Sequence, residues 1–210
     1  MKEHNYTIPL NEALESDVSC FLCSLEDMLS ARALEYYMGA AVMEPNVRIE
    51  TNAKGFCRLH GEKMLSMQKK LPLMLALETR LDTLLSELGK HKKPVRGREK
   101  TCAVCERIEG QMDKALENCA WLLKNEPAFL EKYLESDGVC LHHFYALCEK
   151  LGRRDGALYE KLHAHMVKKL ENLRGDITGF TRGFDYQTAP KENMGHIPPR
   201  AVETLTEKKG

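Results

Sequence analysis

The stretch GFCRLH at residues 55–60 recurs as GVCLHH at residues 138–143. A second motif also occurs twice: CFLC at residues 20–23 recurs as CAVC at residues 102–105. The offset is 82 positions for one motif (20 to 102) and 83 for the other (55 to 138). Two motifs that repeat in the same order at nearly one offset predict two copies of a unit of about eighty residues.

Each copy carries a Cys-x2-Cys pair followed by a Cys-x2-His pair. Side chains three positions apart leave the same side of a helical turn, so each pair can hold one ion. A helix after the first pair and an extended return would bring the second pair of the same copy back to it. Three thiolates and one imidazole are a common structural zinc set. We therefore predict one zinc site per copy, with the ligands Cys20, Cys23, Cys57 and His60 in the first and Cys102, Cys105, Cys140 and His143 in the second.

Several alternatives stay open at this stage. His142 adjoins His143, although the Cys-x2-His spacing favours His143 as the ligand. The same cysteines suit a redox dithiol or an iron–sulfur cluster, or they are plain buried thiols. Cys119 and Cys148 fall on apolar stripes without partners in the repeat, which predicts that they belong to the core.

Apolar residues recur with helical spacing along most of the chain, which predicts an all-α fold. We expect helices over residues 19–42, 57–70 and 140–151, with the second continuing past a kink at Pro72. Residues 47–51, with the sequence VRIET, are the one candidate for a short strand.

The repeat also predicts the domain organisation. Residues 1–91 form the first helical metal-binding repeat, and residues 102–182 form the second. Residues 92–101 are a basic linker, and residues 183–210 form an irregular C-terminal arm that ends in a short helix.

Composition excludes several classes of protein. Hydrophobic residues make up 43% of the 210, which is too many for a disordered chain. Lys plus Arg equals Asp plus Glu at 31 each, so nothing indicates a general nucleic-acid binder. The longest nearly apolar run, residues 71–77, is far shorter than the roughly 20 residues that cross a bilayer. The N-terminus lacks the apolar core of a signal peptide, so we expect a cytoplasmic protein that makes no use of a membrane.

The sequence contains no Gly-rich phosphate loop, no nucleophile elbow and no HExxH motif. Four ligands per site also leave no open position on a zinc ion. The sequence therefore favours a binding or scaffold protein with two zinc ions over an enzyme. It leaves the partner unknown and favours a protein over a nucleic acid. The alternatives are a thiol or iron–sulfur redox protein and a zinc enzyme with one open coordination position.

The duplicated motifs resemble those of an uncharacterised bacterial family of unknown function. The resemblance rests on CFLC at 20–23, GFCRLH at 55–60, CAVC at 102–105, GVCLHH at 138–143 and GFDY at 183–186. It extends over nearly the whole chain, but it implies no established activity and no catalytic residue.

Overall fold

Most of the described residues lie in helices. A computed structural model describes residues 7–90, 102–152, 156–183 and 194–206. Its helices are α1 (Thr7–Leu14), α2 (Phe21–Tyr37), the short 3-10 helix η1 (Ala40–Met43), α3 (Pro45–Lys54), α4 (Arg58–Ser66), α5 (Leu71–Lys90), α6 (Ala103–Asn125), α7 (Pro127–Glu135), α8 (Leu141–Leu151), α9 (Gly156–Arg182) and α10 (Ile197–Leu205). The described residues contain no strand, which confirms the predicted all-α fold. None of their helices combines the length and the apolar character that crossing a membrane requires.

The chain divides into two compact units. Unit 1 contains residues 1–25 and 113–209, and unit 2 contains residues 26–112. Each unit thus combines segments from both predicted repeats. The repeat ranges 1–91 and 102–182 stay a prediction from the sequence.

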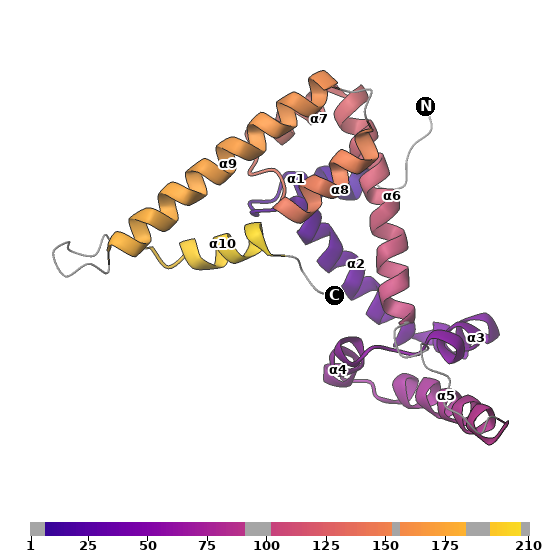
Figure 1. Ribbon diagram of the computed structural model, residues 1–210. Helices are drawn as coiled ribbons and strands as arrows, with labels where there is room; N and C mark the ends of the chain where they lie inside the picture. Colours follow the sequence, from indigo (N-terminus) through magenta and orange to yellow (C-terminus); the bar gives the residue numbers. More distant parts are fainter. Residues whose placement is uncertain (1–6, 91–101, 153–155, 184–193, 207–210) are drawn as a thin grey trace. The chain divides into compact units, whose positions relative to one another are not determined.

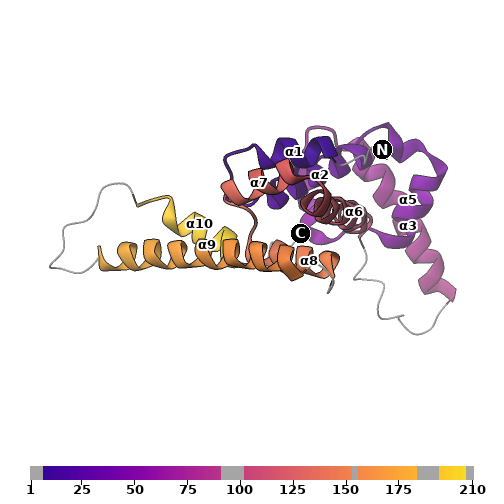
Figure 2. The ribbon, with the colours of Figure 1, turned by 90° about the horizontal axis from the view of Figure 1, so that it is seen from above.

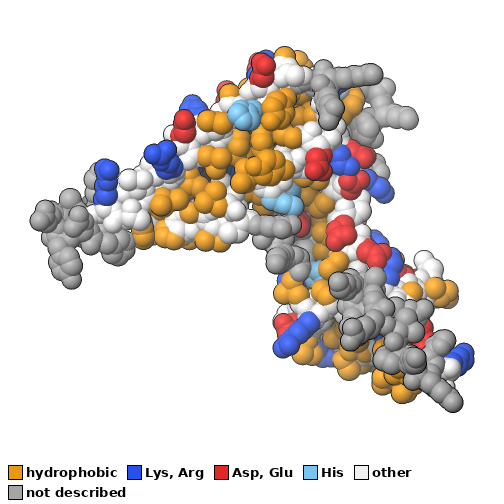
Figure 3. Space-filling view, in the orientation of Figure 1, with side chains coloured by type: hydrophobic (Ala, Val, Ile, Leu, Met, Phe, Trp, Pro, Cys, Tyr) orange, Lys and Arg blue, Asp and Glu red, His pale blue; other side chains and the backbone are white. Residues whose placement is uncertain are grey.

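In unit 1, the long helix α9 packs against α8 and α10, and α1 packs against α7. Figures 1 and 2 both show α10 lying alongside α9. The core includes Leu162, Met166 and Leu173, which line one face of α9. Figure 3 shows hydrophobic side chains gathered on the visible face of α9 and α10. This packing gives the C-terminal arm an ordered helix, close to the one that the sequence predicts.

In unit 2, α3, η1 and α5 pack against one another. Val47 of α3 and Leu73 and Ala76 of α5 are buried. The one candidate for a strand, residues 47–51, is helical, because these residues lie within α3. Pro45 occupies the first turn of that helix, where its missing N–H costs no hydrogen bond.

Two other predicted boundaries also differ from the structure. The helix expected over 19–42 ends at Tyr37, and η1 follows it after a turn. Pro72 begins a new helix instead of kinking an old one, since it is the second residue of α5. The predicted basic linker, 92–101, lies outside the described residues.

Candidate metal centres

Eight cysteine and histidine side chains form two clusters, each with four possible metal ligands. Cluster 1, in unit 1, consists of Cys20, Cys23, Cys140 and His143. Cluster 2, in unit 2, consists of Cys57, His60, Cys102 and Cys105. In each cluster, the four ligand atoms lie within 4.8 Å of one another. These are the eight residues that the sequence singles out.

The predicted grouping of these residues is wrong, because each cluster takes one pair from each copy. Cys20 and Cys23 meet Cys140 and His143 instead of Cys57 and His60. The reason lies in the 17 residues of α2, which carry the chain about 25 Å along the helix axis from Cys20. At its far end, the Tyr37 hydroxyl donates a hydrogen bond to the Ala103 carbonyl, beside Cys102. Cys57 and His60 therefore join Cys102 and Cys105, and the chain does not bring them back to Cys20 and Cys23.

In cluster 1, the imidazole Nδ1 of His143 faces all three sulfurs. It lies 3.5 Å from Cys20 Sγ, 3.4 Å from Cys23 Sγ and 3.3 Å from Cys140 Sγ. Cys23 Sγ and Cys140 Sγ are 3.7 Å apart. Of the two neighbouring histidines that the sequence left open, His143 is therefore the one that lies with the three cysteines.

Cluster 2 repeats this arrangement around Nδ1 of His60. That nitrogen lies 3.2 Å from Cys57 Sγ, 3.5 Å from Cys102 Sγ and 3.3 Å from Cys105 Sγ. Cys57 Sγ and Cys105 Sγ are 3.9 Å apart.

These distances match the edges of a zinc-centred tetrahedron. Zn–S bonds of about 2.3 Å and Zn–N bonds of about 2.0 Å give edges of roughly 3.8 Å between two sulfurs and roughly 3.5 Å between sulfur and nitrogen. The observed sulfur pairs lie at 3.7 and 3.9 Å, and the sulfur–nitrogen pairs lie between 3.2 and 3.5 Å. Both clusters could therefore hold a single tetrahedral metal ion.

All four ligand pairs lie at the starts of helices. Cys57 and Cys140 are the N-cap residues of α4 and α8, while Cys20 and Cys102 immediately precede α2 and α6. The positive end of a helix dipole stabilises thiolates, which are the form of cysteine that binds metal.

A glycine with positive φ precedes each Cys-x2-His pair by two residues. Its carbonyl accepts a hydrogen bond from the segment that carries the Cys-x2-Cys pair of the same cluster. Gly55 has φ of 68° and Gly138 has φ of 69°, a region that residues with a side chain rarely adopt. The Gly138 carbonyl accepts a bond of 3.4 Å from the Phe21 amide, and the Gly55 carbonyl accepts one of 3.0 Å from the Ala103 amide. Both bonds link the two segments that supply one cluster.

Crowding among the donors perturbs the pKa values in cluster 1. Hydrogen bonds with Cys20 and Cys23 hold the pKa of Cys140 far below its usual value, whereas bonds to Cys140 and Cys20 raise the pKa of Cys23. Burial acts to lower the pKa of His143, but hydrogen bonds to Cys140 and Cys20 outweigh it and raise the pKa to about 10. A bound cation would displace the protons that Cys23 and His143 hold, because thiolate and neutral imidazole are the forms that bind metal.

In cluster 2, burial is the main cause of the shifts. Burial raises the pKa of Cys105, and the charges and hydrogen bonds of its neighbours Cys102 and Cys57 add to this rise. Burial also lowers the pKa of His60, and the charge of Lys63 adds to this effect. The neutral imidazole is the form that binds metal.

Two cysteines lie outside the clusters, as the sequence predicts. Cys119 is completely buried, and Cys148 is partly exposed. Burial raises the pKa of both thiols, which keeps them protonated and unreactive.

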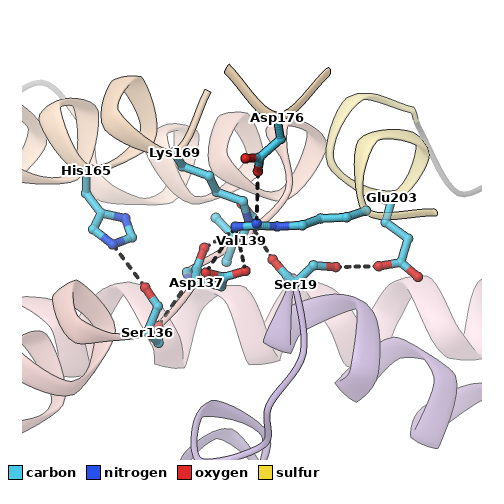
Figure 4. A network of polar contacts seen from close by, with 10 residues as sticks. Ser19, Ser136, Asp137, Val139, His165, Lys169, Asp176 and Glu203 are labelled. Carbon is cyan, nitrogen blue, oxygen red and sulfur yellow. Dashed lines mark hydrogen bonds and ion pairs between the residues drawn. The ribbon is translucent and has the colours of Figure 1, made fainter. Parts of the chain in front are cut away.

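Sequence reasoning missed a buried lysine beside cluster 1. The Lys169 ammonium donates hydrogen bonds to three backbone carbonyls: that of Ser19, that of Asp137 at 2.8 Å and that of Val139 at 3.0 Å (Figure 4). Ser19 and Val139 directly precede the ligands Cys20 and Cys140, so one side chain joins both halves of the cluster. A signal existed in the sequence, because Lys169 interrupts the apolar stripe of Leu162, Met166 and Leu173 on α9.

Salt bridges and hydrogen bonds surround this lysine and reach α10. Arg200 of α10 pairs with Asp137 at 3.2 Å and with Asp176 at 3.5 Å. The Ser19 hydroxyl hydrogen-bonds to Glu203, and His165 contacts the Ser136 carbonyl at 3.1 Å (Figure 4). Segments from α9, from α10 and from the connection between α7 and α8 thus support cluster 1 from outside.

Comparison with protein families finds one family that matches almost the whole chain. The sequence pattern described as "Family of unknown function (DUF6062)" matches residues 1–208. The chain belongs to the DUF6062 family. The match covers both clusters and the helices that carry them. Comparisons with curated proteins and with solved structures found no match.

Proposed function

We propose that this member of the DUF6062 family is a cytoplasmic zinc protein that binds a protein partner. One Zn²⁺ ion in each cluster stabilises the helical fold. The observation that carries this proposal is the spacing of the donor atoms, which matches one tetrahedral ion bound by three sulfurs and one nitrogen.

The donor spacing supports a single ion over an iron–sulfur cluster. A cluster distributes its protein ligands over several irons, which separates them farther than ligands that share one ion. All four donor atoms of each cluster lie within 4.8 Å of one another, which supports one shared ion. Zn²⁺ also prefers tetrahedral sets of thiolate and imidazole and undergoes no redox chemistry. The free state of all eight cysteines is consistent with the reducing cytoplasm.

Four protein ligands support a structural role for both ions. A catalytic zinc keeps a position for water or substrate, whereas these sets fill the coordination shell. Most of the ligands are almost fully buried, with 3% exposure or less: Cys20, Cys140 and His143 in cluster 1, and Cys102 and His60 in cluster 2.

The exposed face of α5 supports the partner-binding part of the proposal. Six large apolar side chains at helical spacing are between 42% and 68% exposed: Leu71, Met74, Leu77, Leu81, Leu85 and Leu88. The opposite face of α5 packs against α3 and η1. A helix that is apolar on two faces is typical of one that is covered on both.

Charges beside this stripe favour a basic amphipathic helix of another protein over a second copy of the chain. Glu78 and Asp82 are exposed along its edge. An antiparallel pair of α5 helices from two copies would bring Glu78 near Asp82 and Lys70 near Lys90. Like charges at such positions are destabilising. Lysines on a separate helix would instead pair with the acidic edge.

Metal analysis of the native protein tests the metal part of the proposal. Protein purified without added metal or chelator should contain two zinc ions per chain and no iron, as measured by elemental mass spectrometry. Cys148→Ser, outside both clusters, serves as the matched control and should keep both ions. Clearly fewer than two metal ions per chain, or iron with visible absorbance, would overturn this part.

Synthetic helices test the binding part. A fluorescently labelled peptide of leucine and lysine at helical spacing should bind the zinc-loaded protein, whereas the same design with glutamate in place of lysine should not. Leu81→Glu should abolish binding and leave the zinc content unchanged. Equal binding of both peptides, or a dimer that Leu81→Glu dissolves, would contradict the proposed partner.

A further inference from the structure

The two clusters have the same donors, but cluster 2 is less well enclosed. In cluster 1, only Cys23 is partly exposed. In cluster 2, both Cys57 and Cys105 are partly exposed. A metal ion in cluster 2 therefore has two sulfur ligands within reach of solvent and of a competing chelator.

The helices that carry the histidine ligands also differ in their support. The 11-residue α8, which bears His143, packs against α9 and α10. The nine-residue α4, which bears His60, packs against no other helix of the described residues to a similar extent. Only His60 and Met64 of α4 are buried, while Leu65 is 55% exposed. The attachment of α4 therefore depends largely on the metal ligands themselves.

Lys169 gives cluster 1 a buried support that cluster 2 lacks. Its ammonium holds the carbonyls that precede Cys20 and Cys140. In cluster 2, the two segments are joined by an ion pair between Lys54, three residues before Cys57, and Glu106 of α6 at 2.6 Å. Both side chains of this pair are partly exposed (32% and 42%), so solvent screens it, whereas Lys169 is buried. The segments of cluster 2 are therefore joined less firmly when no ion is bound.

The outer nitrogen of His60 is also unsupported. Its Nε2 is buried and has no hydrogen-bond partner among the described residues. Histidines that bind metal usually donate this N–H to a carboxylate or a carbonyl, and loss of that contact weakens metal binding by about 10–100-fold.

We propose that cluster 2 is an exchangeable zinc site and that cluster 1 is a permanent one. When free zinc is scarce, the ion leaves cluster 2 first and α4 separates from the start of α6, while cluster 1 keeps its ion. The protein thereby responds to the zinc concentration through one of its two sites. This inference rests on the proposed function, because it requires that both sites hold zinc.

Release kinetics test the inference on the full chain. Protein with two bound zinc ions is mixed with the chromogenic chelator 4-(2-pyridylazo)resorcinol, and the released zinc is followed by absorbance. We expect two phases of equal amplitude whose rates differ by about tenfold or more. Cys105→Ser should remove the fast phase and keep the slow one.

Hydrogen exchange identifies the site behind each phase without any substitution. The amides of α4 should lose protection in step with the fast phase, and those of α8 should stay protected until the slow phase. Lys169→Met should accelerate the slow phase and leave the fast phase unchanged. The neighbouring exposed Lys168→Met is the matched control and should change neither phase.

The possible failures are distinguishable. Two zinc ions that leave in a single phase, or a fast phase accompanied by exposure of α8, would overturn the inference and leave the proposed function standing. A protein that binds no zinc in either cluster would overturn both. If Cys105→Ser fails to fold, the exchange measurement on the unmodified protein still decides between these outcomes.

Discussion

The two candidate metal centres share their donor residues and differ in their surroundings. Both combine three cysteines and one histidine at helix starts, and both contain a glycine with positive φ whose carbonyl joins the two contributing segments. Cluster 1 is supported by Lys169 and by the packing of α8 against α9 and α10, whereas α4 in cluster 2 has little comparable packing. The two clusters therefore offer the same donor set in surroundings that support it to different extents.

The crossed pairing gives the largest expected effect, which is a difference in zinc content. Cys20→Ser/Cys140→Ser removes two ligands from cluster 1 and should leave one zinc ion per chain. Cys20→Ser/Cys57→Ser removes one ligand from each cluster and should weaken both sites. Elemental analysis after dialysis against a mild chelator measures the difference. If the clusters formed within the repeats, the two variants would show the reverse pattern.

The ligands can be read from the sequence, but their grouping cannot. Cys-x2-Cys and Cys-x2-His are local patterns, and a single helical turn sets the geometry of each pair. Either grouping uses the same eight residues and gives the same donor set. The choice depends on where the far end of α2 lies, and the contact between Tyr37 and Ala103 settles this only in the folded chain.

The helix over residues 47–51 and the role of Lys169 could not be predicted, because the local sequence fits more than one structure. Val47, Ile49 and Thr51 alternate as in a strand, yet Pro45 at the helix start and packing against α5 favour a helix. Lys169 could not be assigned, because a lysine on an apolar stripe gains its partners only from distant carbonyls. The all-α class was accessible, since helical periodicity extends over most of the chain.

Single ligand substitutions should destabilise the two units separately. Cys20→Ser should cost unit 1 several kcal/mol and Cys102→Ser should cost unit 2 a similar amount, because the binding energy of a structural zinc contributes directly to folding. Hydrogen exchange should show lost protection in α8 for Cys20→Ser and in α4 for Cys102→Ser. Exposure of α4 by Cys20→Ser would contradict the crossed pairing.

The two glycines provide a smaller and more local comparison. Gly138→Ala and Gly55→Ala should each cost about 1–2 kcal/mol, because a side chain disfavours positive φ. Gly138→Ala should cost about 1 kcal/mol more, since its new methyl group would lie 2.9 Å from the His165 ring. At Gly55, the nearest atom is Arg80 Nε at 3.6 Å, an ordinary contact. Chemical denaturation of both variants in the zinc-loaded state measures the difference, and equal costs would contradict the close approach of α9 to cluster 1.

The cysteines outside the clusters give the smallest effects and define the background for all other cysteine substitutions. Cys148 is partly exposed, so Cys148→Ser should change the free energy of unfolding by less than about 0.5 kcal/mol. Cys119 has no exposed surface, so Cys119→Ser should cost about 1–3 kcal/mol by burying a hydroxyl group in the core. Neither substitution should change the zinc content or the release rates. A loss of zinc in Cys119→Ser would mean that metal binding by cluster 1 depends on packing in the core of unit 1. Lys169 would then not be the main support of that cluster.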